Sequence, residues 1–178
     1  DLDGVWGKTK WADELKVFVA KQSKANRVFL ANMAANARNR TPPLGFFKGF
    51  VLEHNGQHKH SMNLKRRGTA PLSDVIRVHA LAIGSRKQNS FDRLEDIIAA
   101  KSLPEGKAQD LRDALEYIAM MRIRHQALQI EQGEEPDNNL DPHQLSPFEQ
   151  RNLKEAFAIL EKAQNYLKFS FISNTNVK

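Results

Sequence analysis

HSMNLKRRGTAPLSDVIRVH, residues 60–79, is the stretch around which the rest of the sequence is arranged. It begins with alternating polar and apolar residues and then reaches three consecutive cations, followed by Gly68. Thr69 can cap a helix, Pro71 suits a first helical turn, and apolar side chains follow at helical spacing as far as Ile83. The stretch therefore predicts a turn at Gly68 and a helix that begins directly after it.

Three basic side chains, Lys65, Arg66 and Arg67, come just before this predicted helix start. The first N–H groups of a helix are free, and the helix dipole and nearby cations favour a negatively charged ligand there. The segment from Lys65 to Gly68 is therefore a candidate site for a phosphate or carboxylate. A solvated turn with adjacent cations explains the same pattern, and spacing alone favours that simpler interpretation.

Helical periodicity also dominates the sequence on either side of this stretch. The predicted helices begin and end at capping residues, prolines and glycines. They are a helix capped by Thr9 with Trp11, Leu15, Phe18 and Val19 on one face, a helix over about 26–40, the helix ending near Gly84, a shorter helix capped by Ser90, a long helix from Pro104 to about Gln132, and a last helix with Leu153, Ala156, Phe157, Leu160 and Leu167 inward. The fold class predicted is all-α, a bundle of about six helices.

Residues 45–65 interrupt this helical pattern with period-2 alternation around Asn55-Gly56, which is typical turn chemistry. We expect a short hairpin-like insertion there. Its histidines His54, His58 and His60 could bind Zn²⁺ if they converged. Solvated or hydrogen-bonded histidines are the favoured interpretation, because no cysteine or suitably spaced carboxylate completes a closed site.

The long helix carries a heptad-like line that includes one polar residue, His125, close to Arg122 and Arg124. The apolar members of the line, all expected in a bundle core, are Leu111, Ala114, Ile118, Met121 and Leu128. Charge on such a seam needs a partner. These charged groups have two possible roles. They could form a structural ion pair with Asp74, Asp113 or Asp141, or they could face a ligand.

The polar loop after this helix, GEEPDNNLDPHQL at residues 133–145, contains Asp137, Asn138, Asn139 and Asp141. These residues could bind a metal by composition, but a turn leading into a capped helix explains them better. The next segment, Ser146-Pro147-Phe148-Glu149, is a capping box with proline at the first helical position. It predicts where the last helix begins.

Composition bounds the class of protein. The 178 residues suit a single domain with a core, and no apolar run approaches the roughly 18 residues that a membrane span requires. The absence of cysteine suits a cytoplasmic protein. Residues 1–67 hold 13 Lys/Arg and 5 Asp/Glu, which favours acidic partners or nucleotide phosphates. Nucleic acid is disfavoured, because the aromatic residues mostly follow helical apolar stripes.

Several motifs in this order resemble the C-terminal helical domain of signal-transduction nucleotidyltransferases, over residues 11 to about 167. The motifs are PPLGFFKGFVLEHNGQHKHSMNLKRRGTAPLSDVIRVHALAIG, NSFDRLEDI, RIRHQ, PDNNLDP and LSPFEQRNLKEAF. In such proteins a cyclic-nucleotide-binding-like domain, a CBS pair and a nucleotidyltransferase domain come first. The group is similar in turn to the uridylyltransferase of the PII signalling protein and to glutamine synthetase adenylyltransferase.

Those two enzymes carry an N-L-K…G…D-I-like segment after their nucleotidyltransferase domain. The residues in matching places, with a Lys-to-Asp gap one residue longer, are Asn63, Leu64, Lys65, Gly68, Asp74 and Val75. Arg122 and Arg124 likewise match an R-x-R segment of that group. The resemblance implies that residues 1–10 end a preceding nucleotidyltransferase domain or linker, that 11–170 form the helical domain, and that 171–178 form a flexible tail.

The resemblance also implies that the catalytic carboxylates lie upstream, so this fragment has no catalytic residues or cofactor of its own. Mg²⁺ and a nucleoside triphosphate are expected for the parent enzyme, whose target is a protein or small molecule. Basic residues would lie near the nucleotide, with further residues in support: Lys65, Arg66, Arg67, Gly68, Arg122 and Arg124, then Asn63, Asp74 and His125. The alternative is a homodimerisation or docking module that transmits regulation without contacting nucleotide.

Overall fold

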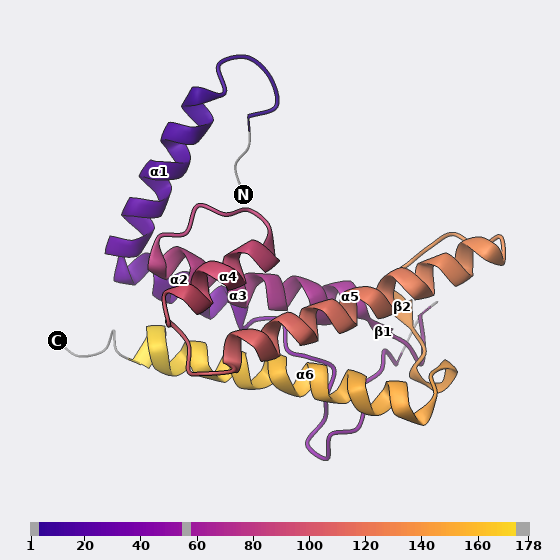
Figure 1. The fold of residues 1–178 in the computed structure, drawn as a ribbon. Helices are drawn as coiled ribbons and strands as arrows, with labels where there is room; N and C mark the ends of the chain where they lie inside the picture. Colours follow the sequence, from indigo (N-terminus) through magenta and orange to yellow (C-terminus); the bar gives the residue numbers. More distant parts are fainter. Residues whose placement is uncertain (1–3, 55–57, 174–178) are drawn as a thin grey trace. The chain divides into compact units, whose positions relative to one another are not determined.

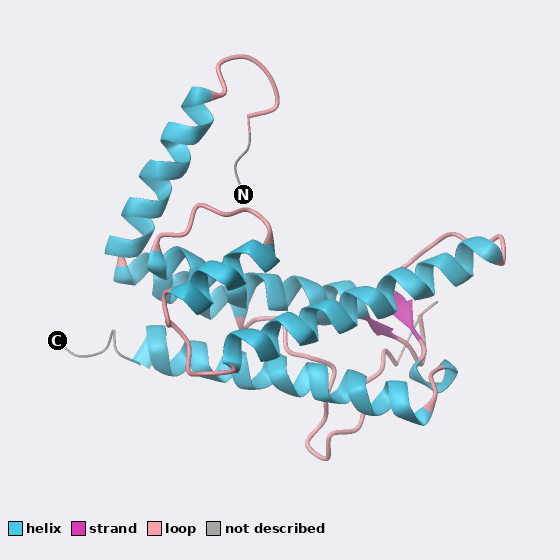
Figure 2. Ribbon diagram, viewed as in Figure 1, coloured by secondary structure: helices cyan, strands magenta, loops and turns pink. Residues whose placement is uncertain are grey.

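The computed structural model describes residues 4–54 and 58–173, which are predominantly helical (Figures 1 and 2). This confirms the predicted all-α class. The elements are α1 Lys10–Ala25, α2 Arg27–Ala37, β1 Met62–Asn63, the π-helical turn η1 Lys65–Thr69, α3 Ala70–Ile83, α4 Ser90–Ala99, α5 Lys107–Glu131, β2 Asn139–Leu140, the 3₁₀ turn η2 Pro142–Gln144, α6 Pro147–Leu167 and the π-helical turn η3 Lys168–Ile172.

The chain divides into two compact units. Unit 1 comprises the described residues of 1–38, 74–109 and 164–178, and unit 2 comprises those of 39–73 and 110–163. Helices α3, α5 and α6 each contribute residues to both units. None of the helices in the described ranges is long and apolar enough to cross a membrane.

In unit 1, the junction of α1 and α2 is built on Asn26. This residue ends α1 and caps α2, because its Oδ1 accepts a hydrogen bond from Phe29 N at 2.9 Å. Leu30 and Ala34 of α2 are then buried. At the end of α2, the carbonyl of Ala37 accepts a hydrogen bond from the buried Gln164 Nε2 at 2.9 Å.

Helix α1 forms as predicted, but the apolar residues on its predicted stripe are mostly exposed. Trp11, Leu15 and Phe18 are 67%, 45% and 59% exposed, and burial in α1 is restricted to Ala20 and Ser23. The side chain of Thr9 forms no capping hydrogen bond, although Thr9 occupies the position before the helix. Helical spacing therefore predicted the helix correctly but not a partner for its apolar face.

In unit 2, the predicted turn at Gly68 is wrong. Residues 65–69 form η1, which leads directly into α3, and Thr69 is buried inside this helical stretch. Asn63 caps it instead, because its Oδ1 accepts a hydrogen bond from Arg66 N at 2.8 Å. Gly68 is required for packing, since a Cβ at this position would lie 2.8 Å from Cγ2 of Ile118.

The hairpin-like insertion is present but short. Glu53 N donates to Ser61 O and His60 N donates to Glu53 O, each at 2.9 Å. The predicted turn at Asn55-Gly56 lies outside the described residues. The regular strand pairing within the described ranges is long-range: β1 pairs antiparallel with β2, with Met62 opposite Leu140 and Asn63 opposite Asn139.

Some of the other helix ends match the local signals and some do not; α2, for example, ends at Ala37 rather than near residue 40. The capping box at Ser146 is confirmed, because Glu149 N donates to Ser146 Oγ at 3.2 Å and Ser146 N donates to Glu149 Oε2 at 2.8 Å. Helix α4, in contrast, is capped by Asn89 rather than by Ser90. Helix α5 begins at Lys107, three residues after the predicted Pro104.

The apolar line of α5 is buried from Leu111 to Met121, but His125 is only partly buried and Leu128 is 45% exposed. The prediction that Leu128 faces the core is therefore wrong, because this side chain lines an open cavity at the end of α5. Inward residues of α6 are buried as predicted: Leu153, Ala156, Phe157, Leu160 and Leu167.

Candidate functional site

The three consecutive cations of unit 2 lie in η1. Lys65 is exposed, Arg66 forms an ion pair with Glu53 at 2.5 Å, and Arg67 Nε donates to the carbonyl of Thr41 at 3.3 Å. Partial burial lowers the pKa of Arg67, against the opposing effect of Glu53. The free N–H groups expected after Gly68 are absent from this part of the described chain, since Ala70 N donates to the Lys65 carbonyl.

Arg122 and Arg124 of α5 contact different parts of unit 2. Arg122 Nη1 donates to Thr69 Oγ1 at 3.2 Å, and its buried Nε has no hydrogen-bond partner among the described residues. Arg124 forms an ion pair with Glu149 and is 59% exposed. The partner of Arg124 is therefore not one of the three aspartates expected from the sequence, and Asp74, a residue of unit 1, pairs with Arg77.

Asp137 is the centre of a dense hydrogen-bond network. Its Oδ1 lies 3.1 Å from His125 Nε2 and accepts from Gln129 Nε2 at 3.3 Å and from Asn139 N at 2.9 Å. Its Oδ2 accepts from Asn139 Nδ2 at 2.9 Å and lies 3.5 Å from His58 Nδ1. Burial raises the pKa of Asp137, but the hydrogen bonds from Asn139, His125 and Gln129 outweigh it and hold the pKa at about 2. Asp137 is therefore a carboxylate that organises its neighbours.

The same loop is attached to the start of η1. Asn63 Nδ2 donates to Asn139 Oδ1 at 2.9 Å, and Leu64 N donates to the Asn138 carbonyl at 2.8 Å. Gln126 Nε2 lies 3.5 Å from Asn138 Oδ1. Three segments of the sequence resemblance, at 63–65, 122–126 and 136–139, therefore meet at one place in unit 2.

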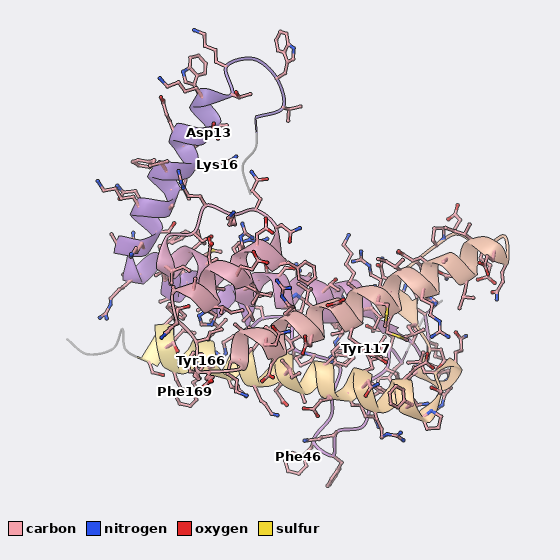
Figure 3. The ribbon with its side chains drawn as sticks, viewed as in Figure 1. Asp13, Lys16, Phe46, Tyr117, Tyr166 and Phe169 are labelled. Carbon is pink, nitrogen blue, oxygen red and sulfur yellow. The ribbon has the colours of Figure 1, made fainter. Side chains whose placement is uncertain are left out.

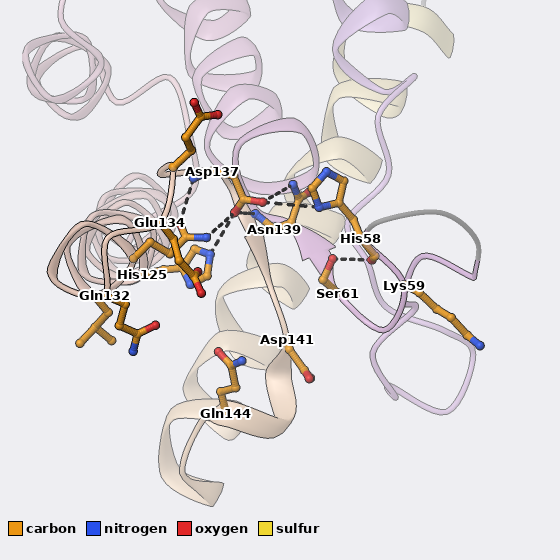
Figure 4. A pocket seen from close by; sticks show the side chains of 13 residues that line it. His58, Lys59, Ser61, His125, Gln132, Glu134, Asp137, Asn139, Asp141 and Gln144 are labelled. Carbon is orange, nitrogen blue, oxygen red and sulfur yellow. Dashed lines mark hydrogen bonds and ion pairs between the residues drawn. The ribbon is translucent and has the colours of Figure 1, made fainter.

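A cavity of about 680 Å³ opens beside this network (Figure 4). It is lined by the end of α5, the 134–141 loop and residues 58–61. Figure 4 shows Asp137 between His125 and Asn139, with the dashed contacts that hold it there. The complete lining is His58, Lys59, Ser61, His125, Leu128, Gln129, Gln132, Glu134, Glu135, Asp137, Asn139, Asp141 and Gln144.

This lining is rich in carboxylates, amides and imidazoles, which suits binding of a polar molecule through hydrogen bonds. Of the predicted site residues, His125 lines the cavity and Asn63 contacts the loop behind it. Gln126, which was not predicted as a site residue, also contacts this loop. Sequence reasoning missed Gln129, which both donates to Asp137 and accepts from its backbone N–H at 2.9 Å. Its position one turn after His125 was the available signal.

The metal-binding candidates considered from the sequence do not assemble. Within 4–54 and 58–173, no group of three or more His, Cys, Asp or Glu side chains could hold a metal ion. His54, His58 and His60 are exposed, and His58 approaches Asp137. Asp141 Oδ1 accepts from His143 N at 2.9 Å, which is the turn chemistry expected of this loop.

In a comparison with protein families, the family model described as "Putative nucleotidyltransferase substrate binding domain" matches residues 27–171. The chain belongs to this family. Within this nucleotidyltransferase substrate binding domain, the Asp137 cavity and the cationic segment both lie inside the matched residues, whereas α1 precedes them. Comparison with curated proteins and with solved structures gave no match.

Proposed function

We propose that this chain is the C-terminal substrate-binding domain of a cytoplasmic, uridylyltransferase-like signalling nucleotidyltransferase. In this proposal it packs against a nucleotidyltransferase domain of the same polypeptide and binds the molecule that accepts the nucleotidyl group. It also presents basic side chains to the nucleotide. Family membership supports the substrate-binding role, and the lack of cysteine suits the cytoplasm. The accompanying CBS and cyclic-nucleotide-binding-like domains belong to the same proposal.

The observation that carries this proposal is the convergence at Asp137. Segments separated by more than 70 residues in the chain are joined there, as the Asn63–Asn139 hydrogen bond shows. The carboxylate has donors on both oxygens, so the loop is fixed and the cavity beside it is pre-formed. A polar cavity whose central carboxylate is held by hydrogen bonds suits binding of an acceptor substrate.

The cations fall into two groups in this proposal. Lys65, Arg66 and Arg124 are exposed at their charged ends and would face the triphosphate, where they stabilise negative charge during transfer. Arg67 and Arg122 donate to groups of unit 2 itself and would position the exposed cations. To contact the triphosphate, Arg124 must break its ion pair with Glu149 and pair with a phosphate instead. The carboxylate and the phosphate are anions of comparable hydrogen-bonding capacity.

Mg²⁺ would be held by the nucleotidyltransferase domain. In this proposal the chain itself supplies no metal ligands. Its own contribution is to bind, orient and stabilise charge.

The test uses a polypeptide that carries this chain behind a nucleotidyltransferase domain. We expect Lys65→Ala combined with Arg124→Ala to raise KM for the nucleoside triphosphate about tenfold, since each change removes a charge-assisted contact. Glu149→Gln tests the same contact from the other side. Glutamine can keep the capping geometry but no longer holds Arg124 by charge, so affinity for the triphosphate should rise.

Lys162→Ala is the matched control, because Lys162 is an exposed cation of unit 2 whose partner is Glu155 on α6. It should leave KM and kcat unchanged. Unchanged nucleotide affinity and turnover in the Lys65/Arg124 double variant would remove the proposed role of these cations. Circular dichroism of each variant separates loss of contact from loss of fold.

The exposed stripe on α1 favours a second candidate function, a dimerisation or docking module. Trp11, Leu15 and Phe18 lie one turn apart on a helix that precedes the family match, and all are exposed. This hypothesis predicts a symmetric dimer that Trp11→Ser with Phe18→Ser dissociates. Sedimentation velocity decides it, because a monomer at all concentrations would exclude self-association.

A further inference from the structure

A second cavity, of about 160 Å³, lies within unit 1, among α1, α2, α3, the 84–89 connection and α4. Its lining carries five cationic side chains: Lys16, Arg77, Arg86, Lys87 and Arg93. Among the described residues that line it there is no carboxylate. The remaining lining includes Phe29 and Leu81, so the cations surround a partly apolar floor.

Arg93 is the innermost of these cations. It is 7% exposed, and its Nε donates to the carbonyl of Lys87 at 2.8 Å, which fixes the 84–89 connection. Burial, and next the positive charge of Arg77, lower the pKa of Arg93. Arg77 and Arg93, which both line the cavity, therefore repel each other, and an anion bound beside them would offset this repulsion.

Nearby carboxylates offset part of this charge from outside the lining. Asp74 pairs with Arg77, Asp13 lies 3.6 Å from Lys16 (Figure 3), and Asp96 accepts from Ser85 Oγ at 2.5 Å. Arg86 and Lys87, by contrast, are exposed, and no described residue forms an ion pair with either. The cavity therefore keeps an excess of positive charge.

We propose that this cavity of unit 1 binds the phosphate group of a small organic phosphate. The volume leaves room for such a group, because a cavity can hold one water once it has roughly 10–15 Å³, and this cavity has about 160 Å³. Five surrounding cations suit a dianion better than a single carboxylate. Phe29 and Leu81 would contact the organic part. The site goes beyond the proposed function and does not depend on it.

The experiment is isothermal titration of the 178-residue chain with inorganic phosphate, with AMP and with adenosine at low ionic strength. Phosphate and AMP should bind at one site and weaken as salt is added, whereas adenosine should not bind. The double variant Lys16→Gln/Lys87→Gln should lose about tenfold in affinity for phosphate. These side chains lie on α1 and on the 84–89 connection, and Lys87 keeps its carbonyl for Arg93.

The matched control is Lys21→Gln/Lys101→Gln, which removes two exposed cations of unit 1 that do not line the cavity. It should bind phosphate as the parent chain does. Equal losses in the two double variants would show nonspecific charge attraction and overturn the proposal. Absence of phosphate binding by the parent chain, or equal binding of adenosine and AMP, would overturn it as well. A negative result in this experiment does not bear on the nucleotidyl-transfer test, because that test changes Lys65 and Arg124 rather than Lys16 and Lys87.

Discussion

Replacing Gly68 by alanine tests the claim that this residue is glycine because of packing. The backbone at Gly68 has no positive φ, so alanine meets no conformational barrier there. An added Cβ would lie 2.8 Å from Ile118 Cγ2 and 3.3 Å from Phe157 Cε1. Both neighbours are fully buried, and neither contact can be relieved by moving a side chain into solvent. One methyl group must therefore displace core atoms.

The expected cost follows from two opposing effects. Overpacking a close-packed core by one methyl group costs about 1–3 kcal/mol. Alanine also restricts the unfolded chain relative to glycine, which favours the folded state by about 0.4–1 kcal/mol. The net destabilisation should be about 1–2 kcal/mol, measured by urea unfolding followed by circular dichroism. Gly49→Ala is the control, because Gly49 has nothing within 4 Å and no positive φ; its stability should change by less than about 0.5 kcal/mol.

A double-mutant cycle identifies the clashing atom. Ile118→Ala alone should cost about 2–5 kcal/mol, because it leaves a cavity in the core. In the double variant the new Cβ at Gly68 enters space that Cγ2 of Ile118 has vacated, so the combined cost should fall below the sum by about 1 kcal/mol or more. Additive costs, or a Gly68→Ala protein as stable as Gly49→Ala, would refute the packing explanation for this glycine.

Three further perturbations act on other residues. Asp137→Asn should destabilise the chain by about 1 kcal/mol at pH 7. This cost should shrink as the pH falls from about 4 towards 2, because Asp137 of the parent chain is itself protonated near its pKa of about 2. Urea unfolding at pH 7 and at pH 3 checks this. Burial lowers the pKa of His79 to about 4, so the unfolded chain binds a proton below pH 6.5 that the folded chain does not. The free energy of unfolding should therefore fall by about 3 kcal/mol between pH 6.5 and pH 4. His79→Leu should diminish this loss, as measured by thermal unfolding. Ser146→Ala should cost about 1 kcal/mol through the lost cap, measured by urea unfolding against Ser173→Ala.

Helix boundaries set by short-range chemistry were predictable from the sequence. The capping box requires only residues 146–149, and its hydrogen bonds form as expected. The end of α5 is equally local, because Gly133 adopts a φ of +76°, which glycine tolerates without strain. In both places, the residues that determine the helix end lie within one helical turn of it, so the local sequence is sufficient to predict that end.

Gly68 shows why other boundaries could not be predicted. In a sequence, glycine is equally consistent with a turn and with close approach of another element. The residue that decides between them, Ile118, is 50 positions away. Phe46, which the sequence did not assign to any element, is 95% exposed and stacks edge to face against Phe47 at 5.2 Å (Figure 3). The spacing of nearby residues indicates neither the packing at Gly68 nor the exposure of Phe46.

The candidate site was predictable as a set of segments but not as a set of contacts. The resemblance named the segments that contain Asn63, His125 and Asp137, and these do meet in unit 2. It did not indicate that Asp137 would be the centre, because composition favoured a simple turn for that loop. The partners of a carboxylate are fixed by tertiary packing, which brings Asn63 to Asn139 across 76 positions.

Glu149 connects the stability of unit 2 to the proposed nucleotide contact. Its Oε2 accepts hydrogen bonds from Ser146 and so caps α6, while its Oε1 holds Arg124. Hydrogen bonds from Ser146, and then the contact with Arg124, lower the pKa of Glu149, so the carboxylate stays charged for both tasks. Because the two tasks use different oxygens, Arg124 can leave for a phosphate while the cap stays formed. The ion pair is therefore compatible with the proposed role of Arg124, because it holds this partly exposed cation through an oxygen that the cap of α6 does not use.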